Sequence, residues 1–375
     1  MEKEINIGAP VGLNNRKPLA RMDASTDAGA GAWLRSAINI DLSSDGYLRR
    51  RKGFQLVQAG DFHSLWSDDK DAYAVVNGSL SHLSPEPTPI ESNVRKPVTY
   101  ARFPDGAVYW SDGNKAGRIN GQDNKPITPP MPNPVPAAQV VDAGLPAGRY
   151  QVCFTRITDG LESAPTEALM FDLPENKGLV FSGVDNNTLI YVTGANGEIF
   201  NEISGNYLSP IAEGAECPTF GLAPIPAGQA LAHYRGSLLM AAGNYLYVSE
   251  PYLYGLHNPV RGFIPFPEPI SVIAPCEDGF YVCADKTYWL PADPLNTTPI
   301  VVLPYGALAK SLVIDDENMT VHWQSKHGIV LAKPSGSVTL PQDQALQFDP
   351  ADTGVSWLRE QNGERHLITT RERGE

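Results

Sequence analysis

A short β-meander, which recurs with variations, is the pattern that most limits how this chain can fold. In residues 229–259, three short apolar segments are separated by the turn dipeptides Arg235–Gly236 and Gly243–Asn244. Strands joined by such tight turns pair antiparallel with their neighbours. A meander of this size is not stable alone, because its apolar face must pack against further sheets. Similar units are therefore expected elsewhere in the chain.

Five further regions repeat this alternation of strands and turns, although not the same letters. Turn dipeptides of the hairpin type occur in them, for example Asn77–Gly78 and Asp105–Gly106. A spacing of roughly forty residues is typical of propeller blades, so we predict an all-β fold with a β-propeller of about six blades. The last unit is short, and we expect Phe54–Val57 to complete it. The five regions span residues 63–83, 98–119, 270–290, 311–340 and 354–369.

One region interrupts the repeat. Residues 129–136, with the sequence PPMPNPVP, form a stiff connector that cannot occupy the centre of a sheet. The alternating segment Tyr150–Thr158, the turn Asp159–Gly160 and the strands that follow resemble the central hairpin of fibronectin type III domains. We therefore expect an inserted fibronectin III-like β-sandwich at residues 137–224. The other predicted regions are an extended N-terminal arm at 1–36 and two propeller parts at 37–136 and 225–375.

Composition and net charge limit which fold classes and binding partners are expected for this chain. The chain has 34 Gly and 33 Pro in 375 residues, which fits a turn-rich all-β protein. Its net charge of -13 argues against a nucleic-acid backbone as the main partner, because such binders concentrate Lys and Arg on one face. The run Arg49–Lys52 is too short to change this conclusion. We expect Arg49, Arg50 and Arg51 to form salt bridges or to line an interface.

No apolar run approaches the roughly twenty residues that a membrane helix needs. Residues 1–12 lack the apolar core of a signal peptide, so we expect the protein to be made and kept in the cytoplasm until it is used. The four cysteines have no zinc-type spacing and are expected to be reduced thiols in the core. They are Cys153, Cys217, Cys276 and Cys283.

Carboxylates in several turns of the chain have both an enzymatic and a purely structural explanation. Glycosidases with a propeller fold need two carboxylates across a central pocket. Four of the chain's Asp-Gly pairs are considered as sources of these carboxylates, but Asp before Gly is also the usual hairpin requirement. The sequence contains no nucleophile elbow, phosphate loop or metal cluster, and we predict no catalytic, cofactor or metal site. The four aspartates are Asp45, Asp105, Asp112 and Asp278; those at 45 and 112 partly resemble the Asp-box of sialidases, without its spacing to a following aromatic residue.

Two aromatic motifs favour binding. Residues 109–119 are similar to one YWTD-type blade of extracellular receptors, and this single copy supports a propeller more than a receptor. A cluster of aromatic residues at 245–263 would suit stacking on a glycan, although alternating strand positions and loop packing explain most of it. Tyr252 and Tyr254 are the candidate interface or glycan contacts.

Together, several segments resemble one family. Asn39–Leu42, Asp45–Phe54, Tyr234–Pro251 and the inserted sandwich are similar to the propeller-bearing hub, nozzle or stabilisation proteins in the tails of short-tailed bacteriophages. The resemblance implies a non-enzymatic virion component that forms a ring of identical subunits, with a hexamer favoured, around the channel through which DNA leaves. A head-to-tail completion component fits the same residues. The implied partners are neighbouring tail or portal and adaptor proteins, with assembly in the host cytoplasm and final location in the virion.

The acidic charge suits a DNA conduit, because a lining that repels phosphate lets the duplex pass without sticking. DNA passage would then be transient rather than a stable complex. The alternative function is a propeller protein that binds or cleaves glycans during host recognition. A ring of copies favours the first function, and hydrolysis of an oligosaccharide by a monomer favours the second.

Overall fold

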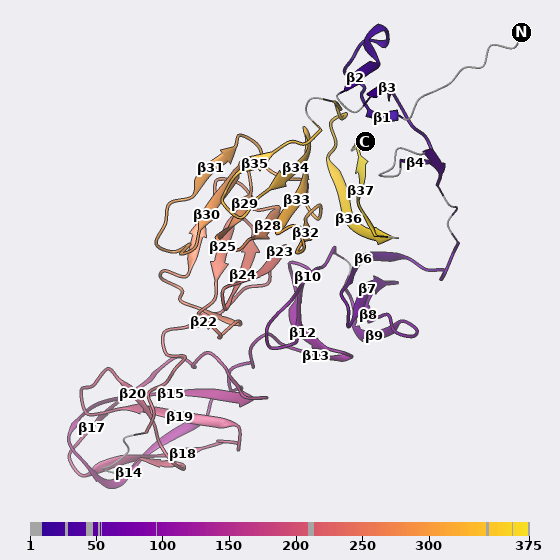
Figure 1. The fold of residues 1–375 in the computed structure, drawn as a ribbon. Helices are drawn as coiled ribbons and strands as arrows, with labels where there is room; N and C mark the ends of the chain where they lie inside the picture. The colour runs from indigo at the N-terminus through magenta and orange to yellow at the C-terminus, as the bar shows by residue number, and fades with distance from the viewer. Residues whose placement is uncertain are drawn as a thin grey trace, which may run out of the picture. The chain divides into compact units, whose positions relative to one another are not determined.

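The computed structural model describes the chain at residues 10–26, 29–42, 48–51, 53, 55–94, 96–208, 214–342, 345–361 and 363–373. Apart from one turn of 3-10 helix, η1 (Leu19–Arg21), the regular structure described there is β-strand, which confirms the all-β prediction (Figure 1). No helix in this described part is long and apolar enough to cross a membrane. Asp45, Lys52 and Phe54, on which sequence predictions rest, lie outside the described residues.

The chain divides into two compact units, residues 62–269 and residues 1–61 together with 270–375. The first unit contains three four-stranded antiparallel meanders, in which hydrogen-bonded neighbours follow chain order. Their strands are β6 (Phe62–Ser67), β7 (Ala72–Val76), β8 (Ser79–His82) and β9 (Thr88–Glu91); β10 (Thr99–Arg102), β11 (Val108–Ser111), β12 (Ala116–Asn120) and β13 (Asp123–Lys125); and β23 (Ala230–Tyr234), β24 (Ser237–Ala242), β25 (Tyr245–Val248) and β27 (Phe263–Pro265).

The predicted turn dipeptides set the register of these meanders. Asn77 and Gly78 both have positive φ, at 50° and 79°, and they join Val76 to its partner Ser79. Arg235 and Gly236 do the same at φ 44° and 80° between β23 and β24. Two consecutive residues with positive φ match the twist of a two-residue hairpin.

The same unit contains two further sheets between residues 137 and 208. Side chains of both sheets share one apolar core, in which Phe154 and Phe181 meet edge to face at 5.8 Å. The fibronectin III-like identity of this region stays a prediction. One sheet has β14 (Ala137–Leu145), β18 (Lys177–Ser182) and β21 (Tyr207–Leu208); the other has β15 (Gly148–Thr158), β16 (Leu161–Glu162), β17 (Leu169–Leu173), β19 (Thr188–Thr193) and β20 (Phe200–Glu202).

A short pairing marks the return to the third meander. β22 (Ala223–Pro224) hydrogen-bonds to β26 (Leu256–His257), which lies in the loop between β25 and β27. His257 adds a side-chain contact, since its Nδ1 lies 3.1 Å from the carbonyl oxygen of Ala223. The segment that follows the two-sheet region is therefore fixed to the blade that comes after it.

The second unit holds two more four-stranded meanders that pack on a shared core. Tyr281 and Trp323 lie 5.4 Å apart in this core, and the Tyr281 hydroxyl donates to the carbonyl of Lys333 at 2.6 Å. The strands are β28 (Val272–Pro275), β29 (Gly279–Cys283), β30 (Thr287–Pro291) and β31 (Ile300–Leu303), then β32 (Val313–Asp315), β33 (Thr320–Ser325), β34 (Gly328–Ala332) and β35 (Val338–Thr339).

These five meanders are propeller-type blades, and the predicted fold class is confirmed at that level. The sixth expected unit is a hairpin of two strands, β36 (Thr353–Gln361) and β37 (Glu364–Glu372). The prediction that residues 54–57 complete it is wrong for the described residues 55–57, which form no strand. Leu56 and Val57 are instead 78% and 97% exposed.

The region predicted as an extended arm contains a small sheet. The N-terminal strands are β1 (Pro10–Leu13), β2 (Asp23–Thr26) and β3 (Gly29–Leu34), followed by the hairpin β4 (Ile40–Leu42) and β5 (Leu48–Arg50). Asn15 attaches the region to the C-terminal part of the same unit: its backbone N–H donates to Ala345 O at 3.0 Å, and its side chain exchanges two hydrogen bonds with the backbone of Gln347.

Candidate functional site: an aromatic pocket at residues 104–256

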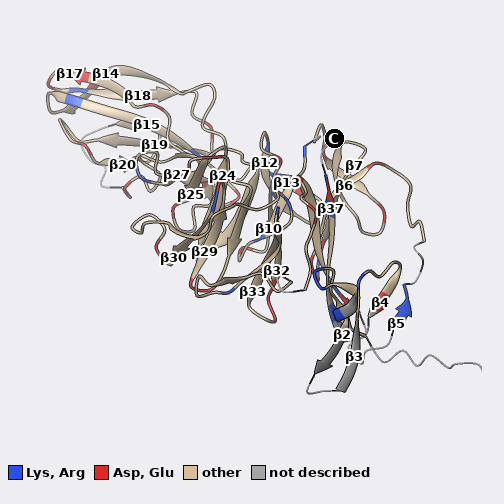
Figure 2. Cartoon of the chain, turned by 90° about the horizontal axis from the view of Figure 1, so that it is seen from above, with Lys and Arg blue, Asp and Glu red and all other residues tan. Residues whose placement is uncertain are grey.

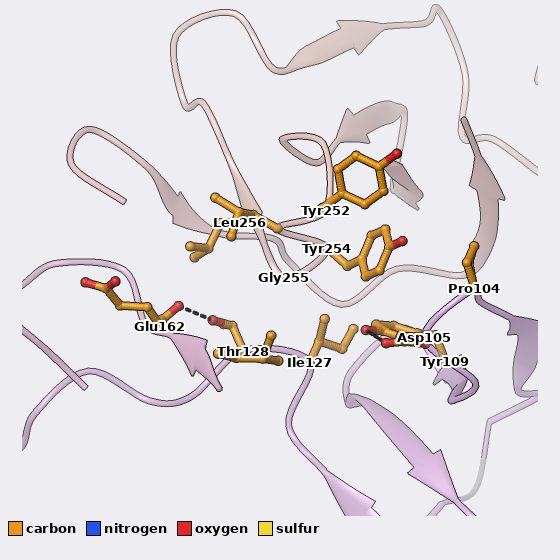
Figure 3. A pocket seen from close by; sticks show the side chains of 12 residues that line it. Pro104, Asp105, Tyr109, Ile127, Thr128, Glu162, Tyr252, Tyr254, Gly255 and Leu256 are labelled. Atoms are coloured by element: carbon orange, nitrogen blue, oxygen red, sulfur yellow. Dashed lines mark hydrogen bonds between the residues drawn. The ribbon is translucent and has the colours of Figure 1, made fainter. Parts of the chain in front are cut away.

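A pocket of about 360 Å³ lies within the unit of residues 62–269 (Figure 3). Four chain segments that are distant in sequence line it, and both predicted contact residues, Tyr252 and Tyr254, are among them. Most of the lining is apolar or aromatic, with a few polar groups, which is the usual composition of a small-ligand pocket. The segments are residues 104–109, 127–128, 161–162 and 252–256.

Stacked aromatic rings form a rigid floor. Phe103 and Tyr109 stack with centroids 4.0 Å apart, and Tyr254 meets them edge-on at 4.9 and 5.6 Å. Tyr109 and Tyr254 are both buried. Burial raises the pKa of each phenol above its ordinary value, so both stay neutral hydroxyl groups. Tyr254 therefore belongs to the core, as alternation and loop packing suggested.

Tyr252 has a different environment. Its side chain is 74% exposed and its backbone has φ 61°, an unusual conformation for a bulky residue. The N–H of Tyr252 donates to the carbonyl of Gly236 at 2.7 Å. A Cβ at position 236 would lie 3.2 Å from Tyr252 Cζ, so the ring rests on this turn. One part of the ring is thus supported by Gly236, while most of its surface stays exposed.

Asp105 supplies the carboxylate next to this floor. One oxygen accepts a hydrogen bond from the Ala107 N–H at 3.0 Å, and the other accepts from the Tyr109 hydroxyl at 2.8 Å. The residue is exposed in the turn between β10 and β11. Asp105 therefore has the hairpin role predicted from the Asp-Gly pair. It also contacts Tyr109, which orients its carboxylate, and the sequence did not indicate this contact.

Glu162 is a pocket residue that the sequence reading missed. Its Oε1 accepts hydrogen bonds from Thr155 Oγ1 at 2.6 Å and from the Tyr191 hydroxyl at 3.0 Å. Its backbone carbonyl accepts from Thr128 Oγ1 at 3.4 Å. In Figure 3 the Glu162 carboxylate points away from the tyrosine rings. Asp105 and Glu162 consequently do not face each other across the pocket.

The YWTD-like segment has a packing role. Strand β11, which contains Tyr109 and Ser111, is buried throughout. Ser111 Oγ donates to the Gly228 carbonyl at 2.7 Å and accepts from the Gly228 N–H at 3.1 Å. Asp112 Oδ1 accepts from the N–H groups of Asn114 and Lys115 at 2.8 and 2.7 Å. These contacts close a turn and join β11 to the segment before β23.

The predicted basic residues lie in the other compact unit. Arg49 and Arg50 belong to β5, which is blue in Figure 2 and pairs with β4. Both residues are exposed. Arg51 donates through Nε to Asp41 Oδ1 at 3.0 Å. An exposed ion pair of this kind contributes little to stability. The structure therefore places one of the three arginines in a salt bridge and leaves the other two on the surface.

The cysteines are free thiols, three of them buried. Burial raises the pKa of Cys276 and of Cys283 to about 12, which makes both poor nucleophiles. Across the residues that the structure describes, no group of three or more His, Cys, Asp or Glu side chains is arranged to hold a metal ion.

Comparisons with known proteins give little further information. No known family profile matches the chain, and no curated protein sequence does. Among solved structures, the computationally designed Ika8 protein is 11% identical, covers 82% of this chain and 96% of its own, and has a TM-score of 0.30. BBS1N in complex with ARL6DN is 11% identical, with coverages of 84% and 90% and a TM-score of 0.34. The AfRom2 CNH domain is 7% identical, with coverages of 84% and 98% and a TM-score of 0.29. TM-scores this low say nothing about function.

Proposed function

We propose that this chain is a non-enzymatic structural component of a phage virion, which forms part of a tail ring around the DNA exit channel. Its neighbours would be other copies of itself and adjacent tail, portal or adaptor proteins. The motif resemblance at residues 39–54 and 234–251 supports the family. One structural observation supports assembly: an exposed apolar segment and a two-stranded sheet occur in the same compact unit.

The exposed segment follows strand β5. Every described residue from Leu48 to Asp61 is exposed, and no strand is formed after Arg50. Leu56 and Val57 would gain free energy by leaving water, since each apolar side chain contributes roughly 1.5–3 kcal/mol on full burial. No contact in the described part of this segment buries Leu56 or Val57. We therefore expect the surface of a partner to bury them.

The two-stranded sheet offers such a surface. Its inner side is held by Gln324, whose Nε2 donates to Val355 O at 3.0 Å and to Thr370 O at 3.1 Å. On the outer side Trp357 is 60% exposed beside its cross-strand partner Ile368. A sheet of only two strands is marginal, and its edges accept a further strand. An apolar extended segment from a neighbouring copy would add that strand by β-augmentation.

The charges near the hairpin β36–β37 are compatible with its pairing to a segment of residues 48–61 from another copy. Arg365, at the turn end of the hairpin, is within salt-bridge distance of three carboxylates, those of Asp315, Glu317 and Glu360. Three negative groups around one guanidinium leave local negative charge. The exposed Arg49 and Arg50 lie a few residues before Leu56, within reach of such a site in an extended segment.

The pocket does not favour catalysis. Hydrolysis of a glycosidic bond needs two carboxylates on opposite sides of the scissile bond. Of the two in this pocket, Glu162 is bound by Thr155 and Tyr191 and points away. We therefore prefer a structural role to the glycan-cleaving alternative.

Light scattering coupled to size-exclusion chromatography tests the proposed assembly. We expect the wild-type chain to elute as a ring several times heavier than its 40.6 kDa monomer. The double substitution L56D/V57D should shift it to monomers, because it places two charges in the segment that the proposed contact between copies would bury. A matched control is V260D, which changes a residue that is 85% exposed in the other unit and should leave the mass unchanged. A wild-type monomer at high protein concentration would contradict the proposal.

A further inference from the structure

The backbone of Tyr252 has a positive φ of 61°, and the packing of its side chain does not compensate for the cost of this conformation. Positive φ costs free energy for a side chain of this size. The turn is fixed by the Tyr252 N–H bond to Gly236 and by the Leu253 N–H bond to Glu250 O at 3.1 Å. Because the ring is 74% exposed, little apolar burial offsets the cost. Strain kept at an exposed aromatic residue beside a pocket points to a binding role.

The ring is also a prearranged platform. Gly236, at φ 80°, lies against the ring, and any side chain there would meet the Tyr252 ring atoms at 3.2–3.5 Å. The ring is therefore supported on the turn, and the rest of it faces solvent. An aromatic face carries negative electrostatic potential and attracts the weakly positive C–H groups of a partner.

A polar acceptor completes the site. Figure 3 shows Tyr252 and Tyr254 on one side of the pocket, with Ile127 and Asp105 on the other. Each Asp105 oxygen already accepts one hydrogen bond, from Ala107 or from Tyr109, and retains capacity for another. Those two contacts fix the direction of the carboxylate, so a ligand hydroxyl meets an acceptor that needs no rearrangement.

We infer that this pocket binds one ring of an oligosaccharide, which stacks on Tyr252 and donates hydroxyl hydrogen bonds to Asp105. A pyranose has both an apolar C–H face and several hydroxyl donors, which matches this pairing of a ring face with an oriented carboxylate. The volume of about 360 Å³ lies at the lower end of small-ligand pockets. Cleavage is not part of the inference, since Glu162 is turned away.

The probe is an array of immobilised oligosaccharides from bacterial lipopolysaccharides and capsules, with titration calorimetry on any hit. Wild type should bind at least one, and Y252A should weaken binding about tenfold, as expected for the loss of one stacking contact. Y252F keeps the ring and should bind within about twofold, whereas D105N should weaken binding about threefold through its poorer acceptor. Y207A removes an exposed tyrosine of β21 and serves as the control, with unchanged affinity.

One further variant separates binding from structure. Y252G accepts positive φ without strain, and this gain offsets the extra entropy that Gly gives the unfolded chain, so it should unfold within a few degrees of wild type and still lose glycan binding. A melting temperature lower by about ten degrees or more, beyond what the entropy of Gly explains, would show that Tyr252 is retained for packing and would overturn the inference. No binding by wild type to any glycan, equal binding by Y252A, or tighter binding of an oligolysine peptide would also overturn it. None of these outcomes depends on ring assembly.

Discussion

At the scale of single residues, the turn before β7 contains an ion-pair network with a clear pH signature. Arg102 donates to Asp68 Oδ2 at 2.7 Å and to Asp71 Oδ2 at 2.6 Å. Burial by itself raises the pKa of Asp68, but the Arg102 side chain and the N–H groups of Asp71 and Lys70 outweigh it and lower this pKa to about 2. The carboxylate is therefore favoured in the folded state.

This network predicts a loss of stability in acid. Since the pKa of Asp68 is lower when folded than its ordinary value of 3.8, its contribution is present above pH 4 and disappears as the pH falls toward 2. The group is solvent-accessible, so we expect about 1 kcal/mol or less. Urea unfolding of D68N, compared with wild type, should show a deficit at pH 7 that vanishes near pH 2. A deficit of equal size at both pH values would contradict this explanation.

Single residues were predictable from the sequence where local backbone chemistry alone decides their conformation. The turn at 77–78 was predicted because Asn and Gly tolerate positive φ, and the turn at 235–236 was predicted from Gly236, beside which Arg235 also has positive φ. The strain at Tyr252 was not predicted, because no residue type signals a left-handed tyrosine. Glu162 was missed for another reason: its importance comes from Thr155 and Tyr191, whose side chains reach it only after the sheets form.

At the scale of elements, the contact between β33 and the terminal hairpin depends on one buried amide. Gln324 is fully buried, and the two hydrogens of its Nε2 are shared among Val355 O, Ser356 Oγ and Thr370 O, which lie 2.9–3.1 Å away. Gly354 is needed beside it, because a Cβ there would approach the Gln324 amide to 2.8 Å. The hairpin is thus attached by hydrogen bonds more than by apolar packing.

We expect Q324A to release the hairpin without unfolding the blades. The substitution removes the donor that the carbonyl groups of Val355 and Thr370 share, and the loss of these part-buried hydrogen bonds costs about 1–3 kcal/mol. Hydrogen exchange followed by mass spectrometry should show faster exchange in residues 353–372 and unchanged exchange in 279–291. Q139A, at an exposed position of β14, is the control and should alter neither. Uniformly faster exchange throughout the unit would mean that Gln324 supports the whole core instead.

Elements were predictable where both partners of a sheet are close in sequence. The five meanders follow from apolar segments and turns only a few residues apart. The proposed closure by residues 54–57 requires pairing across some three hundred residues. No local pattern encodes such a pairing, and the described residues 55–57 do not form it.

At the scale of the whole molecule, the blades form a structural scaffold, and the resemblance to phage tail proteins comes from the sequence alone. Blades and the two-sheet region contain the buried apolar cores, while residues 48–61 and the outer side of β36–β37 carry exposed apolar groups. The chain's net charge of -13 would also let DNA pass a ring without adhering to it. Assembly could not be predicted from blade periodicity, because the same meanders build monomeric and oligomeric propellers.

Cryo-electron microscopy of purified virions, combined with mass spectrometry of their proteins, tests the central claim most directly. The account predicts that this chain is found in the particle and that its blades fit a ring of identical subunits in the tail, around the DNA channel. Absence of the chain from virions in which other tail proteins are detected, or its presence only as isolated copies outside any ring, would contradict it.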